Sequence, residues 1–446
     1  MIAGDTIAAI ATAPGRGGVA VIRVSGPEAF AIAERLTGWK NGESDSCPLV
    51  RMVNIRFPRS DQEIASPLID TGLLLAFKSP RSYTGEDVVE FQCHGGAVTP
   101  RRVLEAFLAA GARLARRGEF TERAFLNGKL DYGQAESVLD LVDAKTPRAA
   151  DAALEGLSGR RRRELRALYE SALDLSTRLE HALDVDEGEL PDDFLPTVVS
   201  SVSRLKSSLC DAVRRSAEGR LLNRGALVVL AGPPNAGKSS LMNALLEENR
   251  AIVSDTPGTT RDSIEEWLDL GGWPIRLVDT AGIRETKDEV EGEGVRRAED
   301  LIKRADVVVW LSKPSSIIPL PFSLFPFSSS LLIHPKCDLG RGEGLNVSAK
   351  TGEGLDELRR AIVAKLEKRV AASDSGDAPE GDVAALHEAL ALLGGGRETR
   401  DTGRDEDLVL LANVVRAAAE RLGAAIGARY SDDMLDNLFS RFCIGK

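Results

Sequence analysis

One eight-residue stretch constrains the fold of this chain more than any other. Gly232 to Ser239 reads GPPNAGKS and matches G-x-x-x-x-G-K-[ST], the pattern of a phosphate-binding loop, or P-loop. Such a loop follows a buried parallel strand and opens a helix. Ala226 to Leu230 (ALVVL) is apolar and partly β-branched, and Ser239 to Leu246 (SSLMNALL) contains good helix formers. The sequence therefore predicts a doubly wound parallel sheet with a nucleotide at the carboxyl ends of its strands.

The residue types in the loop explain its chemistry. Gly232 and Gly237 allow a tight turn whose N–H groups face phosphate oxygens, and the following helix adds its positive dipole end. We expect Lys238 to reach the β- and γ-phosphates and the Ser239 hydroxyl to coordinate Mg²⁺. The alternative is a glycine-rich turn with an ordinary surface lysine. The predicted nucleotide contacts here are Asn235, Ala236, Gly237, Lys238, Ser239 and Ser240.

Three further motifs, in chain order, indicate which nucleotide binds. Asp279-Thr280-Ala281-Gly282 (DTAG) follows an apolar strand, so the aspartate can hold Mg²⁺ through water and the Gly282 N–H can sense the γ-phosphate. Gly258-Thr259-Thr260-Arg261-Asp262 contains a threonine that can close on Mg²⁺ only when a triphosphate is bound. Ser348-Ala349-Lys350 has the form of a guanine-supporting loop. This set resembles the translation-factor-like P-loop GTPases, so we expect GTP.

The residue that should orient the attacking water is not evident from these motifs. Ile283 stands where Ras-like enzymes have a glutamine, and no arginine finger is apparent. The acidic loop that follows either supplies a carboxylate or is simply solvated. A monovalent cation beside the phosphates can supply the missing charge, and Asn235 is placed to ligate it.

Composition limits the function class and the compartment. A chain of 446 residues with 43% apolar content should contain two or three domains. Its net charge of −11 excludes general attraction to nucleic acid, so an RNA contact needs a local basic patch. The five cysteines have no CxxC spacing, which argues against disulfides or zinc and for the cytoplasm. No apolar run reaches membrane-spanning length.

The rest of the chain divides into an α+β region, two helical regions and the G domain between them. Residues 1–127 should form a small α+β domain, with strands at 20–24, 69–78 and 87–93, helices at 27–36 and 100–110, and glycine-rich loops that are either a binding site or ordinary turns. Residues 128–223 and 371–446 read as helical, and their apolar faces should pack together around an inserted G domain of residues 224–370.

Three details of the helical regions are open at this level. Leu154, Leu157, Leu165, Leu168, Leu175 and Leu179 form one apolar stripe, which Arg160 to Arg163 interrupts. That arginine run is either an RNA phosphate contact or a solvated face paired with Glu155 and Glu164. We expect a loop at 187–196, a linker at 371–382 and a helix at 432–439, but place no helix at 314–330. Cys443 is either a reactive thiol or a small apolar residue in a terminal turn.

Taken together, the motifs resemble the tRNA modification GTPases of the MnmE (TrmE) family from end to end. The matching segments are PGRGGVAVIRVSG, YTGEDVVEFQCHGG, GEFTERAFLNGKLD, GPPNAGKSSLMNAL, TPGTTRD, DTAGIRET and the terminal FCIGK. The resemblance implies a tetrahydrofolate-binding N-terminal domain that also dimerises, a helical domain built from both sides of the insertion, and a Ras-like G domain. It also implies an MnmG-type flavoprotein partner, modification at C5 of the tRNA wobble uridine, and GTP hydrolysis activated by K⁺.

The resemblance assigns roles to individual residues. It matches Asn235, Ser254, Thr256 and Thr259 to K⁺ ligands, and Ser239 and Thr260 to Mg²⁺ ligands. It matches Glu291 to the glutamate that orients water, and Cys443 to a tail cysteine that matters for modification. It matches Arg23, Glu90, Lys129 and Lys446 to contacts of 5-formyl-tetrahydrofolate or a related folate. The remaining expected GTP contacts are Asp255, Pro257, Gly258, Thr280, Ala281, Gly282, Lys336, Asp338, Ser348, Ala349 and Lys350.

One motif departs from the family pattern. The guanine-reading motif N-K-x-D appears here as Pro335-Lys336-Cys337-Asp338, so the asparagine amide is missing. Asp338 can still accept the guanine N1 and N2 protons, and Lys336 can still cover the ring. Two other functions therefore compete with the tRNA-modifying GTPase: a G-protein switch in ribosome assembly, and a folate enzyme with a weakened G domain.

Overall fold

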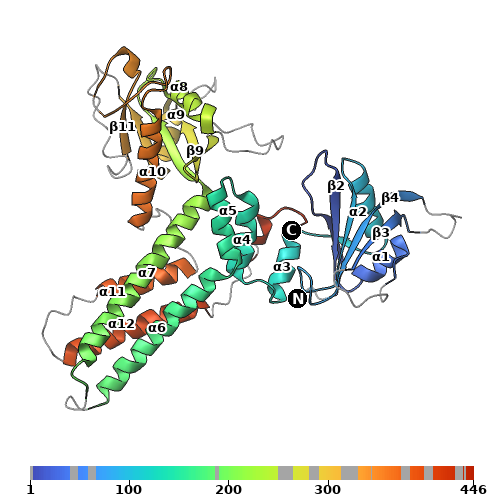
Figure 1. Ribbon diagram of the computed structural model, residues 1–446, viewed down its shortest axis with the longest axis horizontal. Helices are drawn as coiled ribbons and strands as arrows, with labels where there is room; N and C mark the ends of the chain where they lie inside the picture. The colour runs from blue at the N-terminus through green and yellow to red at the C-terminus, as the bar shows by residue number, and fades with distance from the viewer. Residues whose placement is uncertain are drawn as a thin grey trace. The chain divides into compact units, whose positions relative to one another are not determined.

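The structure is a computed structural model that describes residues 4–40, 49–58, 67–185, 190–249, 265–280, 291–312, 330–342, 344–372, 382–395, 405–426, 435 and 438–445. The chain divides into two compact units (Figure 1). Unit 1 contains Met1–Leu139 and Arg429–Lys446, and unit 2 contains Asp140–Ala428. Both ends of the chain thus belong to unit 1.

Unit 1 is built on a six-stranded sheet in the order β3-β4-β5-β2-β1-β6. All neighbouring pairs are antiparallel except β1 with β6. The strands are β1 (Ile7–Ile10), β2 (Val19–Ser25), β3 (Leu49–Arg56), β4 (Leu68–Phe77), β5 (Val88–His94) and β6 (Arg113–Leu114). The strands expected at 20–24, 69–78 and 87–93 are confirmed as β2, β4 and β5; β1, β3 and β6 were not predicted.

Two helices, α1 (Ala29–Thr37) and α2 (Thr99–Ala109), cover one face of this sheet. Alternate residues of β2, Ile22 and Val24, are fully buried in the core beneath them. Because strand side chains alternate, Arg23 lies on the other face. Two more helices follow, α3 (Glu119–Leu126) and α4 (Tyr132–Asp143). Residues from the C-terminal end of the chain, Leu438, Phe439 and Phe442, pack with Ala135 and Leu139 of α4.

The helical part of unit 2 combines segments from both sides of the G domain. Its helices are α5 (Pro147–Leu157), α6 (Arg160–Leu183), α7 (Phe194–Arg224), α11 (Asp382–Gly395) and α12 (Asp405–Ile426). Leu168 of α6, Leu209 of α7, Leu386 of α11 and Val415 of α12 share one core. The predicted insertion of a G domain into a helical domain is therefore confirmed (Figure 1).

Two details of the helical prediction were wrong. The apolar stripe does not run through one helix, since Gly159, with φ +72°, separates α5 from α6. The side chain of Leu154 is 49% exposed, whereas Leu165, Leu168, Leu175 and Leu179 are buried. Helix α7 also begins at Phe194, inside the expected loop, because a proline is tolerated in a first helical turn. The expected helix at 432–439 and the stretch 314–330 lie largely outside the described residues.

The G domain contains a second six-stranded sheet, in the order β12-β11-β10-β7-β9-β8. Its strands are β7 (Ala226–Ala231), β8 (Glu265–Leu270), β9 (Trp273–Asp279), β10 (Val307–Leu311), β11 (Ser330–Pro335) and β12 (Leu345–Val347). Only β8 runs antiparallel to its neighbour. The accompanying helices are α8 (Lys238–Asn249), α9 (Glu291–Arg304) and α10 (Leu355–Ala371). From β7 the sheet continues to β10 on one side and to β9 on the other, so β7 lies at the topological switch point. Ligands of such sheets bind in the crevice beyond the carboxyl end of that strand.

Candidate functional site

The loop between β7 and α8 has the backbone shape that its motif predicts. Gly232 and Gly237 have φ of +148° and +97°, and Asn235 adopts φ +60°. A Cβ at Gly232 would lie 2.6 Å from the Leu311 carbonyl oxygen, so a larger residue does not fit. Helix α8 starts directly after the loop, at Lys238, so the loop lies at a helix N-terminus, which favours anions.

Lys238 folds back over the loop to which it belongs. Its Nζ donates to the carbonyl oxygens of Gly232 and Pro233, both at 3.1 Å, and the residue is only 6% exposed. The ammonium is thereby held on the loop that should cradle the phosphates. The P-loop interpretation, rather than a glycine-rich turn with a surface lysine, is consistent with this burial.

The two described candidates for Mg²⁺ contact one another directly. The Ser239 hydroxyl donates to Asp279 Oδ2 at 2.5 Å. Asp279 ends β9, which pairs in parallel with β7, so Leu230 and Asp279 are register partners. Within the described parts of the chain, no three His, Cys, Asp or Glu side chains form a metal cluster. One carboxylate, one hydroxyl and nucleotide phosphates are nevertheless a donor set that suits Mg²⁺.

The expected base site is formed by the ends of β11 and β12, which are parallel neighbours. The Ser348 hydroxyl donates to Asp338 Oδ1 at 2.7 Å and so orients that carboxylate. Lys336 adopts φ +60°, and its Nζ donates to the carbonyl oxygen of Asn235 at 3.4 Å. The structure therefore joins the base-site motif to the P-loop. Pro335, in the place of the expected asparagine, ends β11.

Several predicted site residues cannot be located. Ser254, Asp255, Thr256, Pro257, Gly258, Thr259 and Thr260, together with Ala281, Gly282 and Lys446, lie outside the described residues. Glu291 begins α9, but nothing is described of its side chain. Their assignments stay predictions. Thr280 is described, and its N–H and hydroxyl both donate to the Leu230 carbonyl oxygen.

In unit 1, two of the expected folate contacts are paired across the sheet. Arg23 of β2 lies opposite Glu90 of β5 in the ladder, and its Nε donates to Glu90 Oε1 at 2.7 Å. The Arg23 guanidinium also lies 5.4 Å from the ring centroid of Tyr83 and 5.7 Å from that of Phe120. Phe120 is fully buried, whereas Arg23, Glu90 and Tyr83 are partly exposed. A partly exposed charged pair beside one accessible aromatic ring suits a flat heterocycle with polar edges.

The other two expected contacts, Lys129 and Lys446, belong to the same unit, and Lys129 is among the described residues. Lys129 Nζ donates to the Pro80 carbonyl oxygen at 3.0 Å. In the C-terminal tail, Ile444 forms a bridge with Arg117, and a Cβ at Gly445 would lie 2.3 Å from the Ile10 carbonyl oxygen. Cys443 is exposed, so it does not serve as a buried apolar residue.

Two family models match the chain. The model for the N-terminus of the GTP-binding protein TrmE covers residues 6–129, and the model for the MnmE helical domain covers residues 133–443. The tRNA modification GTPase MnmE of Symbiobacterium thermophilum is 39% identical over 467 residues, which span 99% of both chains. The protein of the same name from Dichelobacter nodosus is 41% identical over 469 residues and all of both chains. The chain belongs to the MnmE family.

A solved structure of the G domain of the T. maritima FeoB iron transporter also aligns with 31% of this chain, covering 98% of its own length, at 26% identity. Its TM-score of 0.23 is too low to support a conclusion. The MnmE relatives, by contrast, cover 99–100% of this chain. The family motif GEFTERAFLNGKLD corresponds here to α3 and the residues that flank it.

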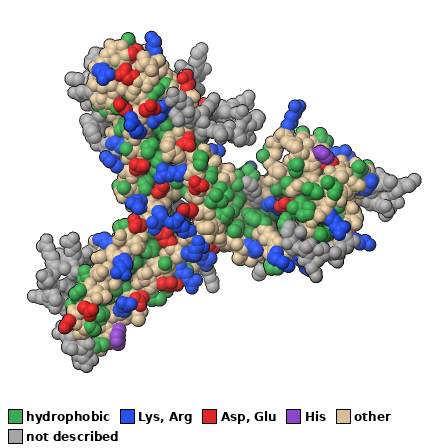
Figure 2. Space-filling view, in the orientation of Figure 1, with side chains coloured by type: hydrophobic (Ala, Val, Ile, Leu, Met, Phe, Trp, Pro, Cys, Tyr) green, Lys and Arg blue, Asp and Glu red, His purple; other side chains and the backbone are tan. Residues whose placement is uncertain are grey.

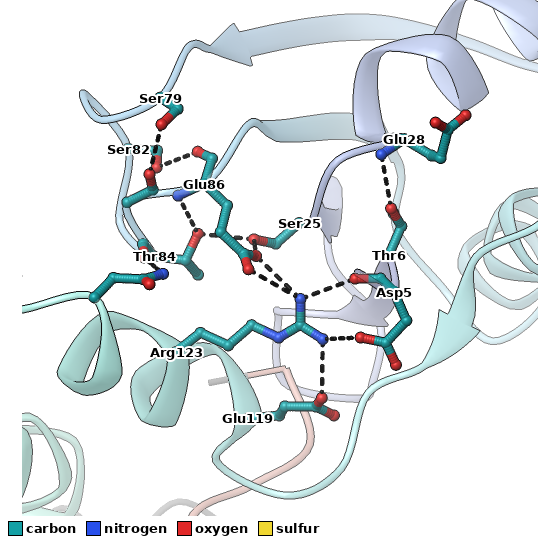
Figure 3. A network of polar contacts seen from close by, with 12 residues as sticks. Asp5, Thr6, Ser25, Glu28, Ser79, Ser82, Thr84, Glu86, Glu119 and Arg123 are labelled. Carbon is teal, nitrogen blue, oxygen red and sulfur yellow. Dashed lines mark hydrogen bonds and ion pairs between the residues drawn. The ribbon is translucent and has the colours of Figure 1, made fainter. Parts of the chain in front are cut away.

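Two residues of that motif, Glu119 and Arg123, belong to a charge cluster that the sequence did not predict. Arg123 pairs with Asp5, Glu86 and Glu119 (Figure 3). Arg113 pairs with Asp5 and Glu119. Only the spacing of Glu119 and Arg123, four residues apart on a helix, was visible in the sequence. The other two partners of Arg123, Glu86 and Asp5, lie 37 and 118 positions away, which no local pattern reveals.

The arginine run of the MnmE helical domain is at least partly paired. Arg160 binds Glu155 at 2.6 Å, and Arg163 donates to the Ser158 carbonyl oxygen. Glu164 pairs with Arg215 of α7. On the face drawn in Figure 2, basic and acidic side chains are interspersed along these helices. These contacts favour the solvated, ion-paired interpretation over a dedicated RNA contact. Among the described residues, no helix is long and apolar enough to cross a membrane.

Proposed function

We propose that this chain is a tRNA modification GTPase of the cytoplasm. With an MnmG-type flavoprotein, it adds a carboxymethylaminomethyl or aminomethyl group to C5 of the wobble uridine of certain tRNAs. The observation that carries the proposal is the full-length similarity to relatives named tRNA modification GTPase MnmE, at 39–41% identity. The chain also combines the Arg23–Glu90 pair, which was expected to bind folate, with a G domain, and this combination is consistent with the proposal.

GTP is the nucleotide that the site supports best. Lys238 lies on the P-loop for the phosphates, Ser239 and Asp279 are placed for Mg²⁺, and Asp338 is oriented for the base. Mg²⁺ would neutralise charge on the β- and γ-phosphates. These residues bind and orient the triphosphate, while the residue that orients water is, by resemblance, Glu291.

K⁺ is the proposed activator of hydrolysis, with Asn235 as one ligand. The exposed position of Asn235 in the P-loop, at φ +60°, supports this assignment. GTP turnover should be measured in KCl and in NaCl, for the wild type and for Asn235→Ala and Glu291→Ala. Stimulation by K⁺ that Asn235→Ala abolishes supports the role, as does a turnover lost in Glu291→Ala. Equal and negligible rates in both salts would reject it.

The modification step is tested on the RNA itself. Nucleosides of tRNA from a strain that lacks this chain should be compared by mass spectrometry with those of the parent strain. We expect the C5-modified wobble uridine to be lost and to return when the gene is supplied. An unchanged uridine profile would exclude the modification role and favour a switch in ribosome assembly.

A folate is the proposed ligand of the Arg23–Glu90 face, with Lys129 and Lys446 as further contacts. The support is the partly exposed Arg23–Glu90 pair beside the Tyr83 ring, which resembles what a pterin ring and a carboxylate tail require. Titration calorimetry with 5-formyl-tetrahydrofolate should show binding that Arg23→Ala weakens strongly. If folate binds while GTP does not, the weakened-G-domain alternative gains support instead.

Dimerisation through the N-terminal domain is proposed on the exposed edge of its sheet. Strand β3 is an edge strand, and it exposes Val50 (51%) and Met52 (66%). Unpaired strand edges are templates for pairing with another chain. Light scattering should give a dimer for the wild type and a monomer for Met52→Lys; a wild-type monomer at all concentrations would exclude the dimer.

A further inference from the structure

Arg123 and Glu119 lie buried at the centre of the charge cluster, whereas Asp5, Glu86 and Arg113 are partly exposed. Arg123 is 8% exposed, and its two terminal nitrogens donate to three partners. Nη1 donates to the Asp5 carbonyl oxygen at 3.0 Å and to the Glu86 carboxylate at 3.1 and 3.2 Å. Nη2 donates to Asp5 Oδ1 at 2.7 Å and to Glu119 Oε1 at 3.1 Å (Figure 3). A planar guanidinium can satisfy such a set only in one arrangement.

One arm of the cluster holds the loop that carries Tyr83. Glu86 accepts a hydrogen bond from Ser25 Oγ at 2.7 Å, and Ser25 Oγ shares another with Thr84 Oγ1 at 2.7 Å. The Tyr83 hydroxyl is bonded to Thr121 Oγ1 of α3 at 2.9 Å. Since the Tyr83 ring lies over Arg23, the cluster fixes one aromatic wall of the proposed folate site.

The other arm holds the turn on which the C-terminal tail lies. Glu119 Oε2 accepts from the Arg116 N–H at 2.7 Å and so fixes the turn before α3. The next two residues of that turn touch the tail: Arg117 bridges Ile444, and the Gly118 N–H donates to the Cys443 carbonyl oxygen at 3.5 Å. Phe120, which directly follows Glu119 on α3, is fully buried and packs with Tyr83 beneath the Arg23 guanidinium.

We propose that Arg123 is a positioning residue that couples the Tyr83 loop to the Cys443 tail. Through Glu86 it fixes the position of the Tyr83 loop, and through Glu119 it fixes the turn that contacts the tail. Folate affinity and the chemical accessibility of Cys443 therefore change together when Arg123 changes. The part that concerns folate rests on the proposed function; the coupling of loop and tail does not.

The test uses the full-length chain with Arg123→Lys, which keeps the charge but replaces the planar guanidinium, whose Nη1 and Nη2 reach different partners, with a single ammonium nitrogen. Arg102→Lys is the matched control, because Arg102 lies on α2 over the Phe57 ring and outside the cluster. Three quantities are measured: affinity for 5-formyl-tetrahydrofolate, amide exchange of residues 79–87, and peptide-resolved alkylation of Cys443. Peptide resolution is needed because Cys210 is also exposed.

We expect Arg123→Lys to weaken folate binding by about tenfold and to speed exchange in 79–87 by about tenfold, with faster alkylation of Cys443. Exchange in the central strands β2 and β5 and all values for Arg102→Lys should stay at wild-type levels. A folded Arg123→Lys with unchanged loop exchange and unchanged alkylation overturns the proposal.

A second variant covers the case in which Arg123→Lys does not fold. Glu86→Gln keeps an acceptor for Ser25 but removes the charge that faces Arg123. It should speed amide exchange in the Tyr83 loop but change the alkylation of Cys443 less than Arg123→Lys does. An unchanged loop in Glu86→Gln also overturns the proposal. If the wild type binds no folate but loop and tail respond as expected, the folate role fails and the positioning role stands.

Discussion

Polar side chains in the nucleotide site are hydrogen-bonded to each other or to the backbone. Ser239 bonds to Asp279, Ser348 bonds to Asp338, and Lys238 bonds to carbonyl oxygens of its own loop. Binding of GTP with Mg²⁺ must exchange the first and third of these bonds for ligand contacts. The bond from Ser348 can persist, because it uses only one of the Asp338 oxygens.

Asp338 therefore offers the sharpest test of base selectivity. In Asp338→Asn, an amide replaces the carboxylate that accepts two guanine protons, so GTP affinity should fall by about 1–3 kcal/mol. Binding of xanthosine triphosphate should improve, since its C2 carbonyl accepts from the new amide. Titration with both nucleotides measures the effect. Asp356→Asn on α10, whose side chain is 84% exposed, should change neither affinity; an unaltered preference for GTP in Asp338→Asn would contradict the assigned role.

Glu119 gives a prediction for the pH dependence of stability. Burial alone would raise the pKa of this carboxyl, but hydrogen bonds from Arg113, the Arg116 N–H and Arg123 lower it from 4.5 to about 2. Because the folded pKa lies below the unfolded value, the stabilisation is present above pH 4.5 and is lost as the pH falls toward 2. The difference amounts to about 3 kcal/mol.

Chemical unfolding of the wild type and Glu119→Gln at several pH values measures this contribution. The wild type should have the larger free energy of unfolding at pH 7. The difference in this free energy between the wild type and Glu119→Gln should decrease steadily between pH 4.5 and 3. Glu122→Gln is a suitable control, because Glu122 is more exposed than Glu119 and pairs with Arg116 at 2.9 Å. A gap that stays constant with pH would show that the Glu119 contribution is not electrostatic.

At the scale of single elements, local pattern and tertiary packing disagree most clearly between α5 and α6. Six leucines share a helical spacing, but Gly159, with φ +72°, lies between α5 and α6 and separates the two helices. The leucines of α6 then face α7 and α12, whereas Leu154 of α5 is half exposed. Spacing alone could not separate the two groups.

Alanine substitutions should reveal that difference. Leu179 is fully buried in the helical core, so Leu179→Ala should lower the free energy of unfolding by about 2–5 kcal/mol. Leu154→Ala should change it by no more than about 0.5 kcal/mol. Thermal or denaturant unfolding of both variants gives the comparison. Equal losses would mean that Leu154 has a partner in solution.

At the scale of the whole molecule, the last residues of the chain complete unit 1. Phe442 is 1% exposed and packs with Phe439, 6.1 Å between ring centroids, in a cluster with Leu139. Phe442→Ala should destabilise unit 1 by about 3–5 kcal/mol. GTP affinity should be unchanged, because that cluster contains no residue of the nucleotide site. Calorimetry with parallel nucleotide titration tests this, and a joint loss of both would show that the units fold as one.

Several features of this protein followed from its sequence alone. The P-loop, its strand and helix, the DTAG aspartate and the base-site residues Asp338 and Ser348 were predicted because local motifs carry them. The inserted G domain was also predicted, since helices on both sides exposed apolar faces that needed a partner. Strands β1, β3, β6, β8 and β12 were missed, because short strands with mixed polarity acquire their partners only within a sheet.

Tertiary structure alone decided how distant residues meet. Asp5, Glu86, Glu119 and Arg123 span more than a hundred positions, and only the packing of β1, the Tyr83 loop and α3 brings their charges together. The same holds for the tail, whose seat beside Arg117 and Ile10 no local pattern indicates. Local chemistry depends on neighbours along the chain, whereas burial and ion pairing depend on neighbours in space, and for this reason the two sources of information were complementary.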